Sequence, residues 1–315
     1  MVKVPKGYRS RNVQDRRGSG GSRRSGGFGF PTSSRGSSGG LGGGLGGALG
    51  GAVLGGAGAA GSRKKGCGGT GLILIVIVGF LLFSNLGGSG NGALDSAPAT
   101  QSSSAEVEAT FDLVNFVLDD VQDFWIDEFA EAGQTYPEAT LIVFENDVRT
   151  GGCGTASSAV GPFYCPADSS AYIDLEYMLL LQRQLGAEGD FSQAYIVAHE
   201  IAHHVQNVLG TNAEVRQAQQ NASRAESNDL SVRLELQADC LAGLWARDAD
   251  QRGILDVGDI QEGINAAEAV GDDAITGSDN QENFTHGSSA QRATWFNAGF
   301  NSGDFGQCDT FNNDI

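Results

Sequence analysis

The sequence predicts an α+β protein: a mostly helical domain with a small mixed or antiparallel sheet over residues 106–315. Apolar side chains recur at helical spacing in several long stretches of this region, whereas only two short runs, 140–144 and 171–174, have the composition of strands. At about 210 residues the region is long enough to bury a single core, and it contains no internal repeats.

Residues 1–66 are predicted to form a disordered, cytoplasmic tail. Residues 1–65 include 21 glycines and few large apolar side chains, so they bury too little surface to offset the entropy lost on ordering. They carry 12 lysines and arginines against one acidic residue, Asp15, whereas the rest of the chain carries 8 arginines, no lysine and 37 acidic residues. This charge split indicates two different compartments.

The uncharged stretch 67–87 is predicted to be one transmembrane helix. Its apolar centre is Gly71–Phe83, and the whole stretch can cross a bilayer at roughly 1.5 Å per residue. The basic cluster 63–65 precedes it, and no basic residue follows before Arg149. This pattern predicts a single-pass protein of the cell membrane, with a cytoplasmic N-terminus and an extracytoplasmic C-terminal domain.

Other interpretations of these segments stay open. The apolar stretch could be a buried core helix or a cleaved signal peptide, although a long arginine-rich lead-in disfavours cleavage. A second uncharged stretch, Leu41–Gly61, could be a span of its own, but 11 of its 21 residues are glycine, which lowers its hydrophobicity and its helix propensity. Residues 88–105 are predicted to be a polar linker.

Patterns of apolar residues typical of helices and of strands follow one another along the domain. The helix predicted over 191–209 ends at Gly210, a residue typical of helix C-termini. The expected elements are, in chain order, a helix over 107–129, strands over 140–144 and 171–174, and helices over 175–185 and 191–209.

The most informative motif, His199-Glu200-Ile201-Ala202-His203, lies inside the last of these helices. Positions i and i+4 of a helix are about 40° apart around its axis, so both imidazoles can reach one metal ion from one face. Glu200 then lies beside the ion, where a carboxylate can take a proton from a metal-bound water. The motif therefore predicts a zinc site with its own general base.

A catalytic zinc site needs a third protein ligand and leaves a fourth position for water. Only His204 and His286 remain among the histidines, so a carboxylate is expected. The best placed is Glu235, in a strongly helical stretch over 234–245, and Asp239 one turn later could accept the spare N–H of a liganding imidazole. The predicted ligands of one Zn²⁺ per chain are His199, His203 and Glu235.

His286 is a further catalytic candidate. It lies in a Gly/Ser-containing segment before an aromatic helical stretch, where an imidazole could hydrogen-bond the developing oxyanion of a peptide carbonyl. The alternative is that it only begins the helix. His204 projects about 100° from His203, so it should not bind the same metal ion. It is expected to pack against other residues or to contact one of the metal ligands.

Four of the five cysteines are predicted to form disulfides, which fits an oxidising compartment. Cys153 and Cys165 flank a loop that a disulfide could close, and Cys240 would then pair with Cys308 and tie the C-terminal tail onto the Glu235 helix. A competing use of Cys240 is zinc binding, but at i+5 from Glu235 it faces another side of the helix.

These residues resemble a known pattern. H-E-x-x-H followed on a later helix by E-x-x-x-D resembles the gluzincin arrangement of thermolysin-type metallopeptidases, and the chain is similar to the neutral zinc metallopeptidase family of bacterial membrane-anchored proteins. One departure is Ala202, where this family is expected to have Gly; the methyl group favours the helix. The matching stretches are 10–18, 153–154, 161–166, 199–206, 235–245 and 284–296.

The resemblance implies a zincin-like fold that hydrolyses peptide or protein substrates, with Glu200 as general base. It also implies an edge strand that pairs with the substrate, and Tyr172–Ile173 is the candidate, with an ordinary core strand as the alternative. A zinc-stabilised, catalytically inactive extracytoplasmic binding domain would carry the same ligands. The acidic composition of the domain excludes nucleic acid as an expected partner.

Overall fold

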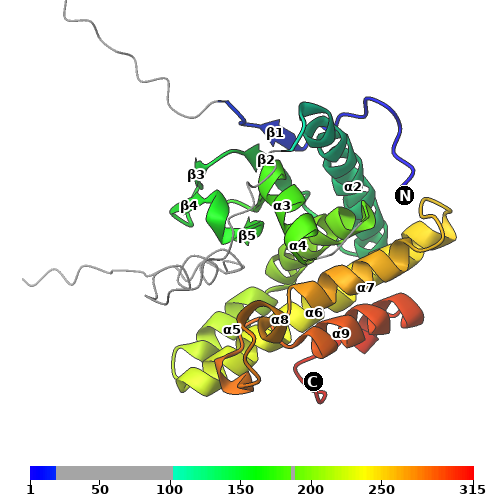
Figure 1. Cartoon of the computed structure of the whole chain (residues 1–315). Helices are drawn as coiled ribbons and strands as arrows, with labels where there is room; N and C mark the ends of the chain where they lie inside the picture. The colour runs from blue at the N-terminus through cyan, green and yellow to red at the C-terminus, as the bar shows by residue number, and fades with distance from the viewer. Residues whose placement is uncertain (19–101, 186–188) are drawn as a thin grey trace, which may run out of the picture. The chain divides into compact units, whose positions relative to one another are not determined.

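A computed structural model describes residues 1–18, 102–185 and 189–315 (Figure 1). This part of the chain is a mostly helical α+β structure, as predicted. The predicted transmembrane helix, 67–87, lies outside it. Among the described residues, no helix is both long enough and apolar enough to cross a membrane.

The strands form a four-stranded mixed sheet and a separate hairpin. They are β1 (Val13–Asp15), β2 (Thr140–Phe144), β3 (Asp147–Arg149), β4 (Thr155–Ser157), β5 (Phe163–Cys165) and β6 (Ser170–Asp174). The sheet order is β1-β2-β6-β5, in which β5 alone is antiparallel to its neighbour, while β3 and β4 pair with each other. The two strands predicted from sequence, β2 and β6, are the central pair.

The helices agree with the predicted periodicities. Ser103 and Ser223 begin the two longest helices with capping boxes, and Gly210 ends α4 in the left-handed conformation, with φ of 88°. The α-helices are α2 (Ser104–Glu131), α3 (Leu175–Leu185), α4 (Phe191–Leu209), α5 (Thr211–Gln219), α6 (Arg224–Gln251), α7 (Asp259–Ala269), α8 (Asp272–Thr276) and α9 (Ser289–Ser302). Short 3₁₀ turns cover Ser158–Val160, Gln281–Asn283 and Phe305–Cys308.

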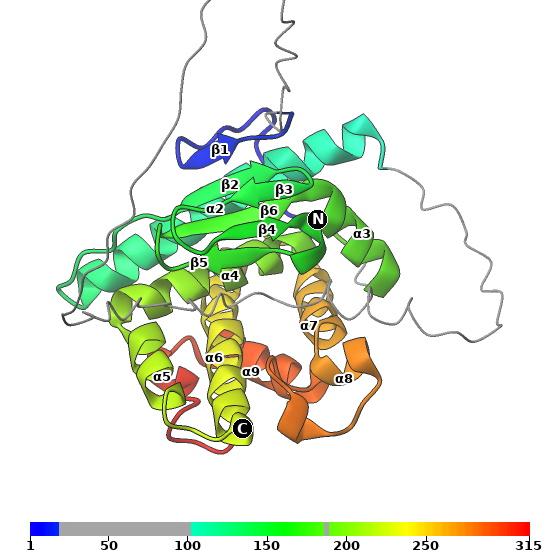
Figure 2. The same cartoon turned by 90° about the vertical axis from the view of Figure 1, so that its left-hand side faces the viewer.

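Helix α4 is central to the described structure. Figure 2 shows the sheet on one side of α4 and helices α5 to α9 on the other. Its apolar face contributes side chains to one continuous core shared with the sheet, α2, α6 and α9. The helix that carries the H-E-x-x-H motif is therefore held from several directions at once.

Helices α6 and α9 cross in close contact at two glycines. A Cβ atom at Gly299 would lie 1.9 Å from the carbonyl oxygen of Cys240, and one at Gly243 would lie 2.2 Å from that of Phe296. Only residues without a side chain allow the two backbones to approach this closely. The crossing fixes α9 against the helix that carries Glu235.

Residues 1–18 fold against the domain, so the prediction of a disordered tail over 1–66 is wrong for this part. β1 pairs with β2, and the Tyr8 hydroxyl donates to Asp119 Oδ2 at 2.8 Å. Only two of the 21 glycines of residues 1–65 lie in this segment, so the composition of the whole tail concealed a short sequence able to fold. Residues 19–66 lie outside the described part.

Both predicted disulfides are present. Cys153 joins Cys165, so the loop after β3 is tied to β5, and Cys240 joins Cys308, so α6 is tied to the C-terminal 3₁₀ turn. Because Cys240 is bonded to Cys308, it does not act as a metal ligand.

The disulfide that closes the longer loop should stabilise the fold more. Loop-closure entropy predicts that Cys240→Ala/Cys308→Ala, which opens a 68-residue separation, lowers the free energy of unfolding by about 4 kcal/mol. For Cys153→Ala/Cys165→Ala, with a separation of 12 residues, the loss is about 3 kcal/mol. Urea unfolding of both variants beside the parent measures this order, and the reverse order would contradict it.

Candidate metal centre

Helices α4 and α6 bring the three predicted zinc ligands together. Donor atoms of His199, His203 and Glu235 all lie within 4.8 Å of one another, and the three residues are buried. His199 Nε2 is 3.1 Å from Glu235 Oε2, and His203 Nε2 is 3.4 Å from Glu235 Oε1. The helical spacing of the motif therefore places both imidazoles on the face of α4 that meets α6.

The outer nitrogen of each imidazole has its own acceptor. His199 Nδ1 lies 2.9 Å from Asp239 Oδ1, and His203 Nδ1 lies 2.8 Å from Gln206 Oε1. If each Nδ1 carries the proton, both Nε2 lone pairs point toward Glu235, which is the arrangement that a zinc ion requires. Asp239 has the position predicted for it. Gln206 was not predicted, although its i+3 spacing from His203 could have revealed it.

The buried atoms around the cluster fit a metal and its water. In the described part of the chain, His203 Nε2 and Glu200 Oε2 are buried without a hydrogen-bond partner. Buried polar atoms are normally paired, and a bound metal ion with its water would supply the partners that these two atoms lack. Two imidazoles with one carboxylate form a donor set typical of catalytic zinc.

Glu200 is buried beside the cluster. Burial raises the pKa of its carboxyl group, and the nearby histidines oppose this effect only in part. A raised pKa suits a group that must take up a proton and release it again near neutral pH. The carboxylate also lines a cavity of about 30 Å³ together with His199 and largely apolar neighbours, among them Pro162, Leu181, Ile196 and Val270.

Arg292 of α9 supports the cluster indirectly, because it binds Asp239, which in turn contacts His199. Its Nε lies 2.8 Å from Asp239 Oδ2 and its Nη2 lies 2.9 Å from Oδ1, while the Tyr195 hydroxyl also donates to Oδ1. Burial alone raises the pKa of Asp239, but the charges of Arg292 and His199 outweigh it and lower that pKa. The carboxylate that orients His199 is therefore held ionised. No sequence signal connects Arg292 to Asp239, 53 positions earlier.

His286 is not part of the ligand cluster. Its Nδ1 lies 3.0 Å from Asp272 Oδ1, and its backbone N–H donates to Asp272 Oδ2 at 2.7 Å. Burial raises the pKa of Asp272, but the contacts with His286 outweigh it and lower the pKa. The structure thus gives His286 a carboxylate partner that fixes the orientation of its ring.

His204 points away from the metal ligands, as its spacing predicted. Its Nδ1 lies 2.8 Å from the Tyr164 hydroxyl, and its Nε2 lies 2.6 Å from the carbonyl oxygen of Pro137. It joins α4 to the loop before β2 and to β5, so its role is structural.

Of the two interpretations of Tyr172–Ile173, the substrate-binding edge strand is wrong and the ordinary core strand is confirmed. These residues belong to β6, which is buried and pairs with β2 on one side and β5 on the other. Neither edge of β6 is available to a substrate. The outer strand at that end of the sheet is β5, and Pro162, immediately before it, lines the cavity beside Glu200.

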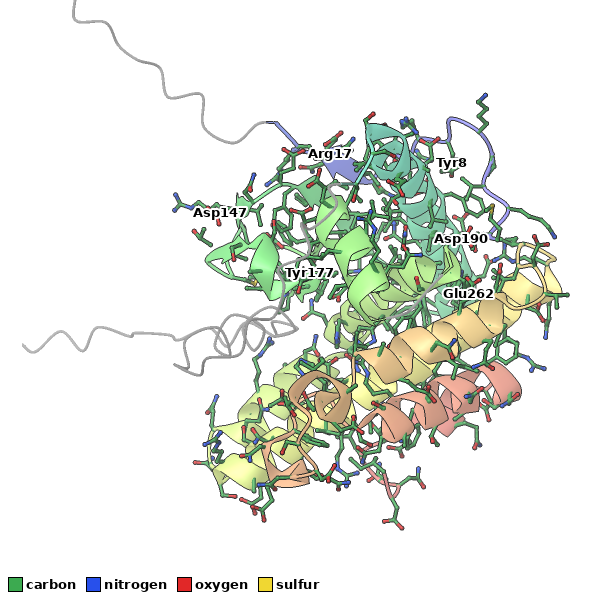
Figure 3. All side chains as sticks on the ribbon, viewed as in Figure 1. Tyr8, Arg17, Asp147, Tyr177, Asp190 and Glu262 are labelled. Carbon is green, nitrogen blue, oxygen red and sulfur yellow. A yellow bond between two sulfur atoms is a disulfide. The ribbon has the colours of Figure 1, made fainter. Side chains whose placement is uncertain are left out.

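A second acidic group lies where α4 meets α7. Asp190, Asp259 and Glu262 are close enough to hold a cation, and Figure 3 shows Asp190 and Glu262 near each other. The Met1 ammonium group lies 2.6 Å from Asp259 Oδ1 and 3.9 Å from Asp190 Oδ1, so a cation of the chain itself already pairs with these carboxylates.

The metal-free protein should show a pH-dependent stability that reports on His199. Burial alone lowers the pKa of His199, but Asp239 and Glu235 outweigh it and raise the pKa to about 9. The folded protein therefore holds this proton more tightly than the unfolded chain, and the stabilisation is lost as pH rises from about 6.5 to about 9.

In chelator-treated protein we expect the free energy of unfolding to fall over this range by about 3 kcal/mol. Urea unfolding at several pH values measures the slope of the free energy of unfolding against pH. His199→Gln should abolish it, and an equal slope in that variant would rule out His199 as its source.

The comparisons with known proteins agree with a zinc site. A sequence profile of the family described as "putative neutral zinc metallopeptidase" matches residues 44–311. The chain is 43% identical over 264 residues to the uncharacterized protein YpfJ of Escherichia coli strain K12, a match that covers 82% of this chain and 92% of YpfJ.

A second relative comes from another bacterium. The uncharacterized protein Rv2575 of Mycobacterium tuberculosis strain H37Rv is 46% identical over 194 residues, which cover 57% of this chain and 64% of that protein. No solved structure is significantly similar to this one. The profile match covers most of the chain, including all three candidate zinc ligands, and the chain therefore belongs to the neutral zinc metallopeptidase family.

Proposed function

We propose that this protein is a zinc-dependent peptidase whose ligands are His199, His203 and Glu235. The observation that carries the proposal is the unpartnered, buried carboxylate oxygen of Glu200 beside this ligand set. A purely structural zinc site is closed by four protein ligands and has no use for such a carboxylate. Glu200 and His199 also line a cavity of about 30 Å³, which has room for a water molecule at the same point.

Each residue of the site has a defined task in peptide hydrolysis. When bound, zinc acts as a Lewis acid that activates water and polarises the scissile carbonyl. Glu200 takes the proton from the attacking water and passes it to the leaving amine, so that it ends the reaction ionised as it began. Asp239 and Gln206 hold the two imidazoles in the tautomer that presents Nε2.

His286 is proposed to stabilise the developing oxyanion. The contact between its Nδ1 and Asp272 favours a proton on this nitrogen in the neutral ring and orients the imidazole, and a protonated ring would donate from Nε2 as well. A donor aimed at the oxyanion lowers the barrier because negative charge develops there only in the transition state.

The proposed location is the extracytoplasmic face of the cell membrane, with the chain anchored through 67–87 and no nucleic-acid partner. Two observations support it: the absence of charge in that stretch and the two disulfides of the domain, which persist in oxidising compartments. The substrate is proposed to be a peptide or protein.

Glu200→Gln should separate zinc binding from hydrolysis. The amide keeps the size of the side chain and leaves the ligands intact, but it cannot accept the proton, so we expect one zinc per chain and a fall in peptide cleavage of at least about 10²-fold. His203→Ala should lose the zinc itself. Metal analysis of the purified full-length chain measures the zinc content, and incubation of a peptide library with that chain measures cleavage.

Glu268→Gln is the matched control, because this exposed glutamate of α7 makes the same chemical change outside the site. Zinc without cleavage in the parent protein would support a zinc-stabilised binding domain instead. Full cleavage by Glu200→Gln would contradict the general-base role.

His286→Ala should lower kcat by about 10²–10³-fold while zinc content stays unchanged. Asp272→Asn should shift the same parameter in the same direction by a smaller factor, since it removes only the orienting contact. The KM of both variants is expected to change little. A loss of zinc in His286→Ala, or an unchanged kcat, would contradict the oxyanion role.

A further inference from the structure

Strand β1 is an integral part of the sheet. Its residues Val13 to Asp15 lie in parallel register with Leu141 to Val143 of β2. The N–H of Leu141 donates to the carbonyl oxygen of Asn12 at 2.9 Å, and the N–H of Arg16 donates to that of Val143 at 2.7 Å. Without β1, the buried strand β2 would leave backbone groups along one edge without partners.

The residues before β1 pack along helix α2. Asn115, which is buried, accepts from the N–H of Ser10 at 3.1 Å, and the Ser10 hydroxyl donates to Asp119. The Tyr8 ring contacts Phe116 edge-on with centroids 5.5 Å apart. Figure 3 shows Tyr8 beside α2 and Arg17 beside β1.

Charges on the two sides of this contact are complementary. Arg9 pairs with Asp112, and Arg17 lies 3.2 Å from Glu108, both acidic residues of α2. The Arg17 guanidinium also lies over the ring of Phe111 at 4.3 Å from its centroid. The basic character of this short segment is therefore explained by its binding to an acidic helix of the same chain.

We infer that residues 1–18 and the domain 102–315 lie on the same side of the membrane. The hydrocarbon core of a bilayer is about 30 Å thick, so a strand on one side cannot pair with a strand on the other. The chain between them must then cross an even number of times. This excludes the predicted topology, in which one crossing by 67–87 leaves the N-terminus in the cytoplasm.

The sequence contains a second candidate for the extra crossing. The uncharged stretch Leu41–Gly61 precedes the stretch 67–87, and the basic cluster 63–65 separates them. Two crossings would leave this cluster in the cytoplasm, as the positive-inside rule favours, and both parts of the folded unit outside. The inference concerns topology alone and holds whether or not the zinc site is catalytic.

Cysteine accessibility tests the inference on the full-length chain. Starting from Cys67→Ser, one variant carries Lys6→Cys and another Ala218→Cys; both positions are exposed and lie in the two parts to be compared. Each is treated with a membrane-impermeant maleimide in spheroplasts, before and after permeabilisation. We expect the two cysteines to behave alike, so that both react before permeabilisation or both react only after it. If one reacts before permeabilisation and the other only after it, the inference is overturned.

Cross-linking tests the contact that carries the inference. The Asn12 amide donates to Glu138 Oε1 at 2.6 Å, so the pair Asn12→Cys/Glu138→Cys should be joined by the short, permeant reagent dibromobimane in intact cells. After quenching with N-ethylmaleimide and solubilisation, a protease site inserted between Ser33 and Ser34 is cut. The expected result is that the N-terminal fragment stays attached to the domain.

The pair Asn12→Cys/Ala218→Cys is the matched control, because α5 lies far from β1 in both views (Figures 1 and 2). It should release its N-terminal fragment. Release from the Asn12→Cys/Glu138→Cys pair as well would show that β1 does not dock on the domain in the membrane, and would overturn the inference.

Discussion

The buried contact between Asp239 and Arg292 is the interaction on which the candidate site depends. A carboxylate without access to water is stable only when it is paired and fully hydrogen-bonded, and Asp239 meets this condition through Arg292, Tyr195 and His199. The same carboxylate orients His199. Three helices, α4, α6 and α9, are thereby joined at one charged group, so the candidate metal ligands cannot separate without exposing it.

The packing around this contact explains several features that have no chemical role of their own. Glycines at the crossing of α6 and α9 let Arg292 approach Asp239, and the Cys240–Cys308 disulfide holds the C-terminal turn against α6, five residues beyond Glu235. His204 plays the corresponding part on the other side of α4, where it joins the helix to β5. The motif is therefore supported on both faces by residues outside the candidate ligand set.

Most helices and the two central strands could be predicted from the sequence because their signals are local. The period of apolar residues marks α2 and α4, Gly210 marks the end of α4, and the ligands at i and i+4 follow from helix geometry alone. β1, β3, β4 and β5 have three residues each, which is too short for an alternating pattern, and they form only because a neighbouring strand completes their hydrogen bonds.

By itself, the sequence determined the H-E-x-x-H helix, the carboxylate of the candidate ligand set and both disulfide pairs, since each depends on residue type and spacing. The tertiary structure alone decided that residues 1–18 belong to the sheet, that β6 is internal, and that Arg292 and Gln206 support the histidines. The physical reason is that these contacts join segments, or fix side-chain orientations, through packing that no local pattern records. Composition described the first 65 residues as one tail, whereas residues 1–18 form hydrogen bonds to β2 and α2.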